Sequence, residues 1–458
     1  MRHSSFISNF KRIVLCLLML VLLGVCFFSV QTVVKAKFMG DSTTIVNGFY
    51  SEKENTIDVV LIGSSNCFCT IDPMVLYEDY GITAYDFASS SQPMNVSLLY
   101  AKEAMKTQKP KVVALEVNCL IGMELDNLPE NSLRWGLTDI PFSVDKMKCL
   151  SQANIRFGSE YVSYLFPVFR YHERWKEVSK NDFVYAFEKN RENYSKGYLR
   201  TTEVSTEPVL LSDFVQEGES WVGEDVLACL DELVALCQEN GVELVLFKSP
   251  RAGWYSYQSA LVEELANERG LLFVDYQTKI DEISLDAATD FRDAEHLNHN
   301  GAYKVSEDFG AFLRANFDLA DRREEGIYDS AVVYYDRLES QPFAEAATLM
   351  ECYEMVSAEP DYLLIITYQG GINAETGETV YPHHWVYVDG TLCMEEEWTQ
   401  SGVRLKDIDG VQVTLRQTGS ITQVFINNLP YAVTANNWTV IVYDKITEQV
   451  VATLGFDA

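Results

Sequence analysis

The chain is poor in basic side chains. Its 458 residues include 36 Lys and Arg but 67 Asp and Glu, and the formal net charge is −31 at pH 7. A carboxylate surplus of this size would repel the phosphate backbone of nucleic acids and the headgroups of anionic lipids. The composition therefore argues against nucleic acid as a partner and against broad electrostatic adhesion to membranes.

Histidine is also scarce, and the cysteines lack a metal-binding pattern. The chain contains only 6 histidines, and no Cys-x-x-Cys pair stands beside a histidine cluster. We therefore expect neither a zinc site nor another metal or organic cofactor. Beyond the N-terminal segment the cysteines lack the regular spacing of a disulfide framework, so we expect buried thiols. They are Cys67, Cys69, Cys119, Cys149, Cys229, Cys237, Cys352 and Cys393.

One long apolar run lies near the N-terminus. The segment from Ile13 to Val34 contains 22 residues and no charge. Roughly 20 apolar residues in a helix span a bilayer core, whereas the apolar part of a cleavable signal peptide has about 7–15. No Ala-x-Ala cleavage site follows, so we expect a retained single-pass anchor in a cell membrane. Lys11 and Arg12 precede the run, which predicts a cytoplasmic N-terminus and extracellular main domains.

Short apolar runs alternate with amphipathic segments after the anchor. This alternation is typical of βαβ units around a parallel sheet, so we expect an α/β fold. Strands are expected at 59–62, 80–88, 112–117, 242–250 and 271–276. Helices are expected at 97–111, 223–241 and 257–270, and from 300 onward.

The pattern also divides the chain into parts. A stretch of about 100 residues between the third and fourth strands is too long to lack structure, so we expect helices and loops there. After residue 316 the runs become short, apolar and separated by turn residues, which indicates a small β-rich domain. The expected parts are a cytoplasmic tail and anchor (1–35), a polar stalk (36–56), an α/β domain (57–318, with the insert at 120–222), a helical connector (319–358) and a β-rich accessory domain (359–458).

Two segments far apart in the chain carry catalytic residue types. Asp293 and His296 are spaced so that the carboxylate can accept from one ring nitrogen and leave the other free as a general base. Ser64 and Ser65 follow the first expected strand, where catalytic groups of doubly wound sheets are found. Cys67 and Cys69 would lie on the following segment, so we favour packing over nucleophilic roles for them.

The residue patterns of four segments resemble those of the SGNH/GDSL hydrolase superfamily, and within it the DltD-like and alginate-acetylation-like branch of envelope proteins. The segments are LIGSSNCFCTIDP, YGITAYDFASSSQ, KPKVVALEV and DAEHLNHNGAYKVSEDF. The resemblance implies a three-layer α/β/α sandwich of the flavodoxin-like type. It also implies that Ser65 is the nucleophile, with His296 as base and Asp293 orienting it.

The blocks that bind the oxyanion differ from the family pattern. The family's second block supplies a glycine, whereas residues 88–92 contain Ser89, Ser90 and Ser91 instead. The family's third block is Gly-x-Asn-Asp, whereas Asn118 stands alone after the third strand. We therefore expect the Ser65 amide, with Asn118 or the turn at Ser89 and Ser91, to bind the oxyanion. Arg251, after the fourth strand, could bind an anionic group or be a surface residue.

The resemblance implies a membrane-anchored esterase or acyltransferase that acts on O-acyl groups of envelope polysaccharide or teichoic-acid-type polymers. It also implies a membrane-bound acyl donor partner of the MBOAT type. The alternative is a non-catalytic scaffold or glycan-binding protein that keeps the fold, and the altered oxyanion blocks favour it. Residues 361–458 resemble a small ILEI-type β-rich module, which could bind glycan or orient the rest of the protein.

Overall fold

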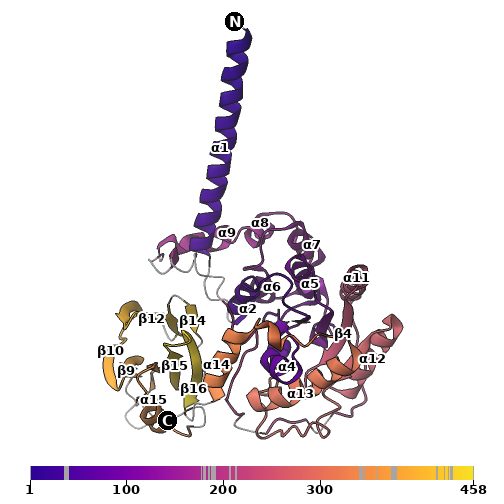
Figure 1. Ribbon diagram of the computed structural model, residues 1–458, viewed down its shortest axis with the longest axis vertical. Coiled ribbons are helices and arrows are strands. Elements are labelled where there is room, and N and C mark those ends of the chain that lie inside the picture. Colours follow the sequence, from indigo (N-terminus) through magenta and orange to yellow (C-terminus); the bar gives the residue numbers. More distant parts are fainter. Residues whose placement is uncertain are drawn as a thin grey trace.

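A computed structural model shows a long N-terminal helix, a central α/β body and a β-rich C-terminal region (Figure 1). It describes residues 2–35, 41–176, 178, 182–183, 186, 192–205, 208–211, 214–339, 343, 346–357, 359–372, 379–418, 421–427, 429–431, 433 and 437–456. Helix α1 (Arg2–Val34) projects from the body, and its stretch Phe10–Val34, exposed over most of its length, is long and apolar enough to cross a membrane. The expected anchor is therefore present as a helix of suitable length and composition.

The body is built on a five-stranded parallel sheet with the order β2-β1-β3-β4-β5. The strands are β1 (Val59–Ile62), β2 (Ala84–Asp86), β3 (Val112–Glu116), β4 (Glu243–Lys248) and β5 (Leu272–Asp275). Strands β1 and β3 are buried along their whole length, as expected for apolar runs in the middle of a parallel sheet. The α/β expectation is confirmed, and the strand order reverses between β1 and β3.

Helices of the body pack in two pairs around the sheet. Helix α4 contacts α13, and α5 contacts α11. The main helices are α3 (Ser65–Phe68), α4 (Pro73–Tyr80), α5 (Met94–Thr107), α11 (Glu224–Asn240), α12 (Ser256–Arg269) and α13 (His299–Asn316). Helix α4 continues to Tyr80 and ends at Gly81 with φ 66°, so the strand expected at 80–88 shrinks to three residues.

The expected polar stalk is wrong over its described part. Residues 41–49 form helix α2 (Asp41–Phe49), and Ile45, Val46 and Phe49 are buried in the core of the body. The ring of Phe49 stacks on Phe87 with centroids 3.9 Å apart. The apolar residues at i, i+1 and i+4 form one helical face, and the polar residues around them hide this signal in the composition.

The insert is helical and looped in its described residues, as expected. It contains α6 (Glu130–Leu137), α7 (Val144–Gln152), α8 (Ser159–Leu165), α9 (Val168–Tyr171) and the 3₁₀ helices η2 (Leu125–Asn127) and η3 (His172–Lys176). A 3₁₀ turn, η1 (Val117–Cys119), links β3 to it. Figure 1 shows α8 and α9 at the side of the body from which α1 projects.

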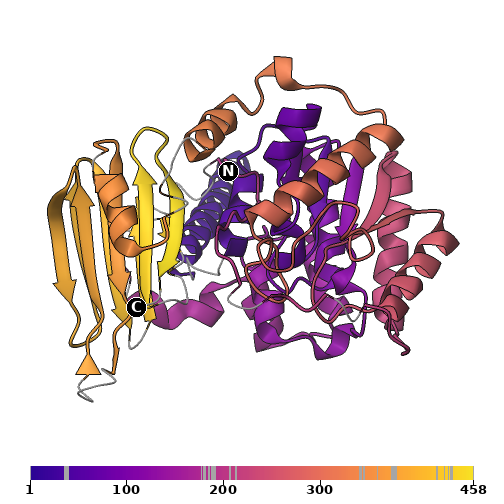
Figure 2. The same ribbon diagram turned by 90° about the horizontal axis from the view of Figure 1, so that it is seen from below.

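The C-terminal region is antiparallel and β-rich, and it lies beside the body (Figure 2). One sheet has the order β10-β9-β6-β15-β16 and comprises β10 (Thr391–Glu397), β9 (His383–Val388), β6 (Tyr362–Tyr368), β15 (Trp438–Asp444) and β16 (Gln449–Phe456). The other comprises β11 (Gly402–Ile408), β12 (Val411–Thr418), β13 (Ile421–Ile426) and β14 (Leu429–Tyr431). A short pair is formed by β7 (Gly371–Ile372) and β8 (Thr379–Val380). The connector contributes η4 (Arg323–Glu325), α14 (Asp329–Glu339) and α15 (Leu349–Ser357).

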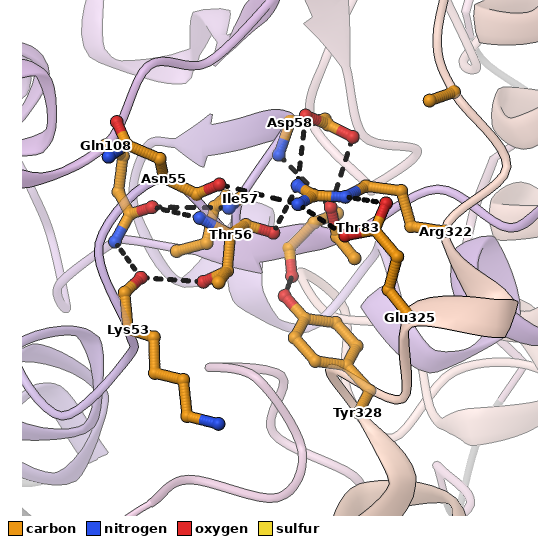
Figure 3. A network of polar contacts seen from close by, with 12 residues as sticks. Lys53, Asn55, Thr56, Ile57, Asp58, Thr83, Gln108, Arg322, Glu325 and Tyr328 are labelled. Atoms are coloured by element: carbon orange, nitrogen blue, oxygen red, sulfur yellow. Dashed lines mark hydrogen bonds and ion pairs between the residues drawn. The ribbon is translucent and has the colours of Figure 1, made fainter.

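A polar network ties the connector to the amino end of β1 (Figure 3). The guanidinium of Arg322 donates to the carbonyl of Thr56 at 3.0 Å and to Asp58 Oδ1 at 3.3 Å. It also pairs with Glu325 at 3.0 Å. Tyr328, next along the connector, donates its hydroxyl to the carbonyl of Ala84 at 2.8 Å. The connector is thereby attached at the amino edge of the sheet, and the hydroxyl of Tyr335 in α14 also donates to Asp72 at the start of α4, on the carboxyl side, at 3.0 Å.

The buried histidine of the β-rich region predicts a pH dependence of stability. His384 lies in β9 and is fully buried, and burial lowers its pKa to about 4, outweighing the hydrogen bond that its ring donates to Gln417 Oε1. An unfolded histidine titrates near pH 6.5, so the unfolded chain binds more protons than the folded chain between about pH 6.5 and 4. The folded state should therefore lose stability as the pH falls through this window.

We expect His384→Gln to reduce this loss, because glutamine does not titrate. Urea unfolding followed by tryptophan emission, at about pH 7 and about pH 5, measures the effect as a change in midpoint. The matched control is His383→Gln at the neighbouring, less buried position. If the urea midpoint fell by the same amount between about pH 7 and about pH 5 in both variants, the prediction would be contradicted.

Candidate active site

The loop after β1 places Ser65 at the start of α3. A Cβ atom on Gly63 would lie 2.7 Å from Glu116 Cβ and 2.9 Å from Cys67 Cβ, so this position accepts only glycine without rearrangement. Ser64 then caps α3, with its hydroxyl oxygen accepting from the Asn66 amide at 3.4 Å. Ser65 is the first helical residue and is partly exposed.

The loop before α13 carries the aspartate and the histidine. A bridge between Phe291 and Leu297 closes this loop, and the Arg292 amide donates to the His296 carbonyl at 3.1 Å. Asp293 Oδ1 accepts from the amides of Glu295 and His296 at 2.8 and 3.0 Å. The carboxylate is thus fixed by the backbone of its own loop before it contacts the imidazole.

The structure brings Ser65, His296 and Asp293 together. His296 Nε2 lies 2.8 Å from Ser65 Oγ, although the two residues are 231 positions apart. His296 Nδ1 lies 2.9 and 3.0 Å from the two carboxylate oxygens of Asp293. Both distances are within hydrogen-bond reach, so the three side chains form a continuous serine–imidazole–carboxylate chain.

The carboxylate of Asp293 is held in its ionised form. Partial burial raises its pKa, but the hydrogen bond and charge of His296, the Glu295 amide and Arg292 together bring the pKa well below its usual range. The Arg292 guanidinium lies 3.3 Å from Asp293 Oδ2. An ionised carboxylate accepts from Nδ1–H, which leaves the Nε2 lone pair directed at the Ser65 hydroxyl.

Polar contacts join the nucleophile helix to the histidine loop. The Asn66 side-chain amide donates to the Glu295 carbonyl at 2.6 Å, and Ser249 Oγ donates to the Asn66 carbonyl at 2.5 Å. Arg251 forms an ion pair with Glu295 Oε1 at 2.5 Å. Asn66 and Ser249 were missed by sequence reasoning, although each directly follows a recognisable feature: Asn66 follows Ser65, and Ser249 follows the fourth strand. For Arg251, the structure shows a contact that secures the histidine loop.

The expected oxyanion donors differ in their availability. As the first residue of α3, Ser65 has an amide with no acceptor inside the helix. Ser89 is buried, its amide donates to the Gly63 carbonyl at 3.4 Å, and its hydroxyl donates to Gln92 at 2.8 Å. Both donors of Ser89 are therefore used within the fold, which corrects its expected role. Ser91 is exposed, and Asn118 is partly exposed just beyond β3.

A buried ion pair lies behind the serine turn and was missed by sequence reasoning. Lys248 Nζ is 2.7 Å from Glu116 Oε1, and neither side chain has any exposure. Burial lowers the pKa of Lys248, and the charge of Glu116 opposes that shift. The second oxygen of Glu116 accepts from the Asn118 amide at 3.0 Å, which fixes the turn after β3. The sequence feature that could have indicated this pair is a single charged residue near the end of each of two apolar runs, Glu116 in 112–117 and Lys248 in 242–250.

The cysteines near the site are packed thiols, as expected. All ten cysteines are free, and Cys67 and Cys69 are fully buried. Burial raises the pKa of Cys67 well above its ordinary value, and the neighbouring Asp86 raises it further. A thiol in this state is a poor nucleophile. Cys393 is the one cysteine beyond α1 that is only partly buried.

We expect Glu116→Gln to destabilise the body by about 3–5 kcal/mol, because it leaves the Lys248 ammonium buried without a counter-charge. Urea unfolding gives the change in free energy from the shift in midpoint and the slope. The double variant Glu116→Gln, Lys248→Met should recover part of the loss. The control is Asp231→Asn, because the exposed carboxylate of Asp231 lies 2.7 Å from Arg269. Loss of this exposed ion pair should lower the free energy of unfolding by about 1 kcal/mol or less. Equal losses from the buried and the exposed variants would contradict this account.

Comparisons of the chain with protein-family models and with curated proteins found no match. The site itself therefore carries the functional argument. Its central feature is the hydrogen-bonded series from Ser65 Oγ through His296 to Asp293 at the carboxyl edge of the parallel sheet.

Proposed function

We propose that the chain is a membrane-anchored serine esterase or O-acyltransferase that works through an acyl-enzyme. The observation that carries the proposal is the 2.8 Å contact between Ser65 Oγ and His296 Nε2, with Asp293 on the other ring nitrogen. The resemblance of the four sequence segments to envelope hydrolases supports the same chemistry.

The proposed reaction has two steps. Ser65 Oγ attacks the acyl carbonyl while His296 Nε2 takes its proton, and the imidazolium then gives that proton to the departing alcohol. A sugar hydroxyl or water next loses its proton to His296 and attacks the acyl-Ser65 ester, which releases Ser65. Asp293 stabilises the imidazolium in both steps. The Ser65 amide and Asn118 are the proposed oxyanion donors, and loss of one donor typically costs on the order of 100-fold in rate.

We infer the remaining features with support from the sequence and the fold. The two helix pairs around the sheet support a three-layer, flavodoxin-like arrangement. Lys11 and Arg12, which precede the apolar stretch of α1, support a cytoplasmic N-terminus and extracellular main domains. The resemblance supports an envelope polysaccharide or teichoic-acid-type polymer as substrate, and a membrane-bound acyltransferase as partner. No cofactor takes part in the proposed steps.

The proposal predicts reaction of a single serine with a fluorophosphonate probe. The full-length chain in detergent or membranes should be labelled at Ser65, and Ser65→Ala should abolish the label. His296→Ala should slow labelling by on the order of 100-fold or more, because the serine loses its general base. Gel fluorescence and peptide mapping measure the rate and the site of labelling.

The matched control is Ser64→Ala, which keeps Ser65 but removes the cap of α3. It should retain labelling after correction for any unfolded fraction. Absence of label in the folded wild-type chain, or label that survives Ser65→Ala, would contradict the proposal that Ser65 is an enzymatic nucleophile. The first outcome would instead support a non-catalytic glycan-binding scaffold, which the internal use of Ser89 favours.

A further inference from the structure

Large aromatic side chains are exposed on the insert. The exposed fractions are 87% for Phe157, 66% for Trp175, 53% for Phe169 and 50% for Phe142. We call these four residues the aromatic rim. They come from η3, from α9 and from the loops that lead into α7 and α8, and Figure 1 shows α9, with α8 next to it, near the base of α1. Leaving large apolar side chains exposed to water has an unfavourable hydration cost, so four of them on one segment of the chain indicate an apolar partner.

The insert packs directly on the membrane-spanning helix. The ring of Phe27, within α1, lies 5.6 Å from Phe166 and 6.3 Å from Phe169, measured between centroids. Phe142 stacks on Phe166 at 5.5 Å. The guanidinium of Arg174 donates to the Val34 carbonyl at 2.8 Å and so satisfies the C-terminal end of α1. The rim is therefore continuous with the helix that leaves it.

The depth of Phe27 sets the depth of the insert. A hydrocarbon core about 30 Å thick is crossed by roughly 20 helical residues, so a span that starts after Arg12 ends near Thr32. Phe27 precedes Thr32 by five residues, which places it about 7 Å inside the hydrocarbon boundary for an upright helix. Phe166 and Phe169, which contact its ring, must then lie near the same depth.

We propose that the aromatic rim is inserted into the boundary between headgroups and acyl chains of a phospholipid bilayer. The proposal rests on α1 spanning the membrane, as in the proposed function. Amphipathic interfacial segments bury about 5–10 Å at this boundary, and Trp and Tyr are enriched there. Two pairs of charges near the rim offset each other, Arg170 with Glu130 at 3.2 Å and Lys176 with Glu173 at 2.7 Å, and the headgroup layer is polar enough to hold them.

The rim would fix how the candidate site stands relative to the bilayer. Helix α2 follows α1 after a few residues, and Ser42 Oγ accepts from the Ser90 amide at 2.9 Å. Ser90 belongs to the turn after β2, at the carboxyl edge where Ser65 also lies. A single helix would let the body swivel, whereas a helix with an inserted rim holds this edge close to the lipid. The acyl-bearing substrate would then be met at the membrane surface.

Tryptophan quenching by brominated lipid tests the proposal on the full-length chain. The chain is reconstituted in phosphatidylcholine nanodiscs, with acyl chains brominated near the headgroup in one sample. The emission of Trp175 is isolated as the difference between wild type and Trp175→Phe among the 7 tryptophans. We expect brominated lipid to lower this difference emission at least two-fold. Phe157→Trp should add further lipid-quenched emission, and its 87% exposure makes the substitution safe for folding.

The matched control is Trp221→Phe, because Trp221 is also exposed, at 51%. Its segment contacts α12 through Gly218 and Tyr257 rather than α1. Its difference emission should be unchanged by brominated lipid. Equal quenching of Trp175 and Trp221, or a Trp175 shielded from both lipid and aqueous iodide, would overturn the proposal. Resistance to carbonate extraction reports on the α1 anchor separately, and fluorophosphonate labelling reports on the enzyme separately.

Discussion

The close approach of β1 and β3 at Gly63 is the constraint on which the candidate site depends. A glycine there lets the chain turn against Glu116, and the turn delivers Ser65 to the first position of α3. Strand order reverses at the same pair of strands, so the loops after them diverge and leave space at the carboxyl edge. The buried pair of Glu116 and Lys248 fills the region behind this turn with matched charges. The position of Ser65 is therefore determined by the backbone turn at Gly63 and by the buried residues behind it, rather than by contacts of the serine side chain.

Short polar contacts, rather than apolar packing, align the two halves of the site. The nucleophile helix and the histidine loop meet through Asn66 and the Glu295 carbonyl, and Arg251 holds Glu295 from the other side. Such bonds are directional, so they fix the position of His296 Nε2 to within the short range that proton transfer requires. The same loop supplies its own carboxylate, and its backbone amides hold Asp293 before the imidazole does.

The sequence predicted those parts that repeat a simple period or a fixed spacing. Continuous apolar runs gave the positions of β1, β3 and β4, and the Asp293-x-x-His296 spacing indicated one half of the site. Helix α2 was missed because its buried face is only a few residues wide within a polar segment. The internal bonds of Ser89 and the pair of Glu116 with Lys248 depend on which loops and strands become neighbours. Long-range pairing of this kind leaves no periodic trace in a single sequence.

The connector to the β-rich region is bonded on both sides of the sheet of the body, and this arrangement has a mechanical consequence. The segment that leaves α1 is bonded to the turn after β2 through Ser42 and Ser90, at the carboxyl edge. The connector to the β-rich region is bonded before β1 through Arg322, Thr56 and Asp58, at the amino edge (Figure 3). The connector is also bonded on the carboxyl side, where the hydroxyl of Tyr335 in α14 donates to Asp72 at 3.0 Å, a few residues after the helix that begins at Ser65. The position of the β-rich region therefore bears on the segment after Ser65 as well as on the amino edge of the sheet.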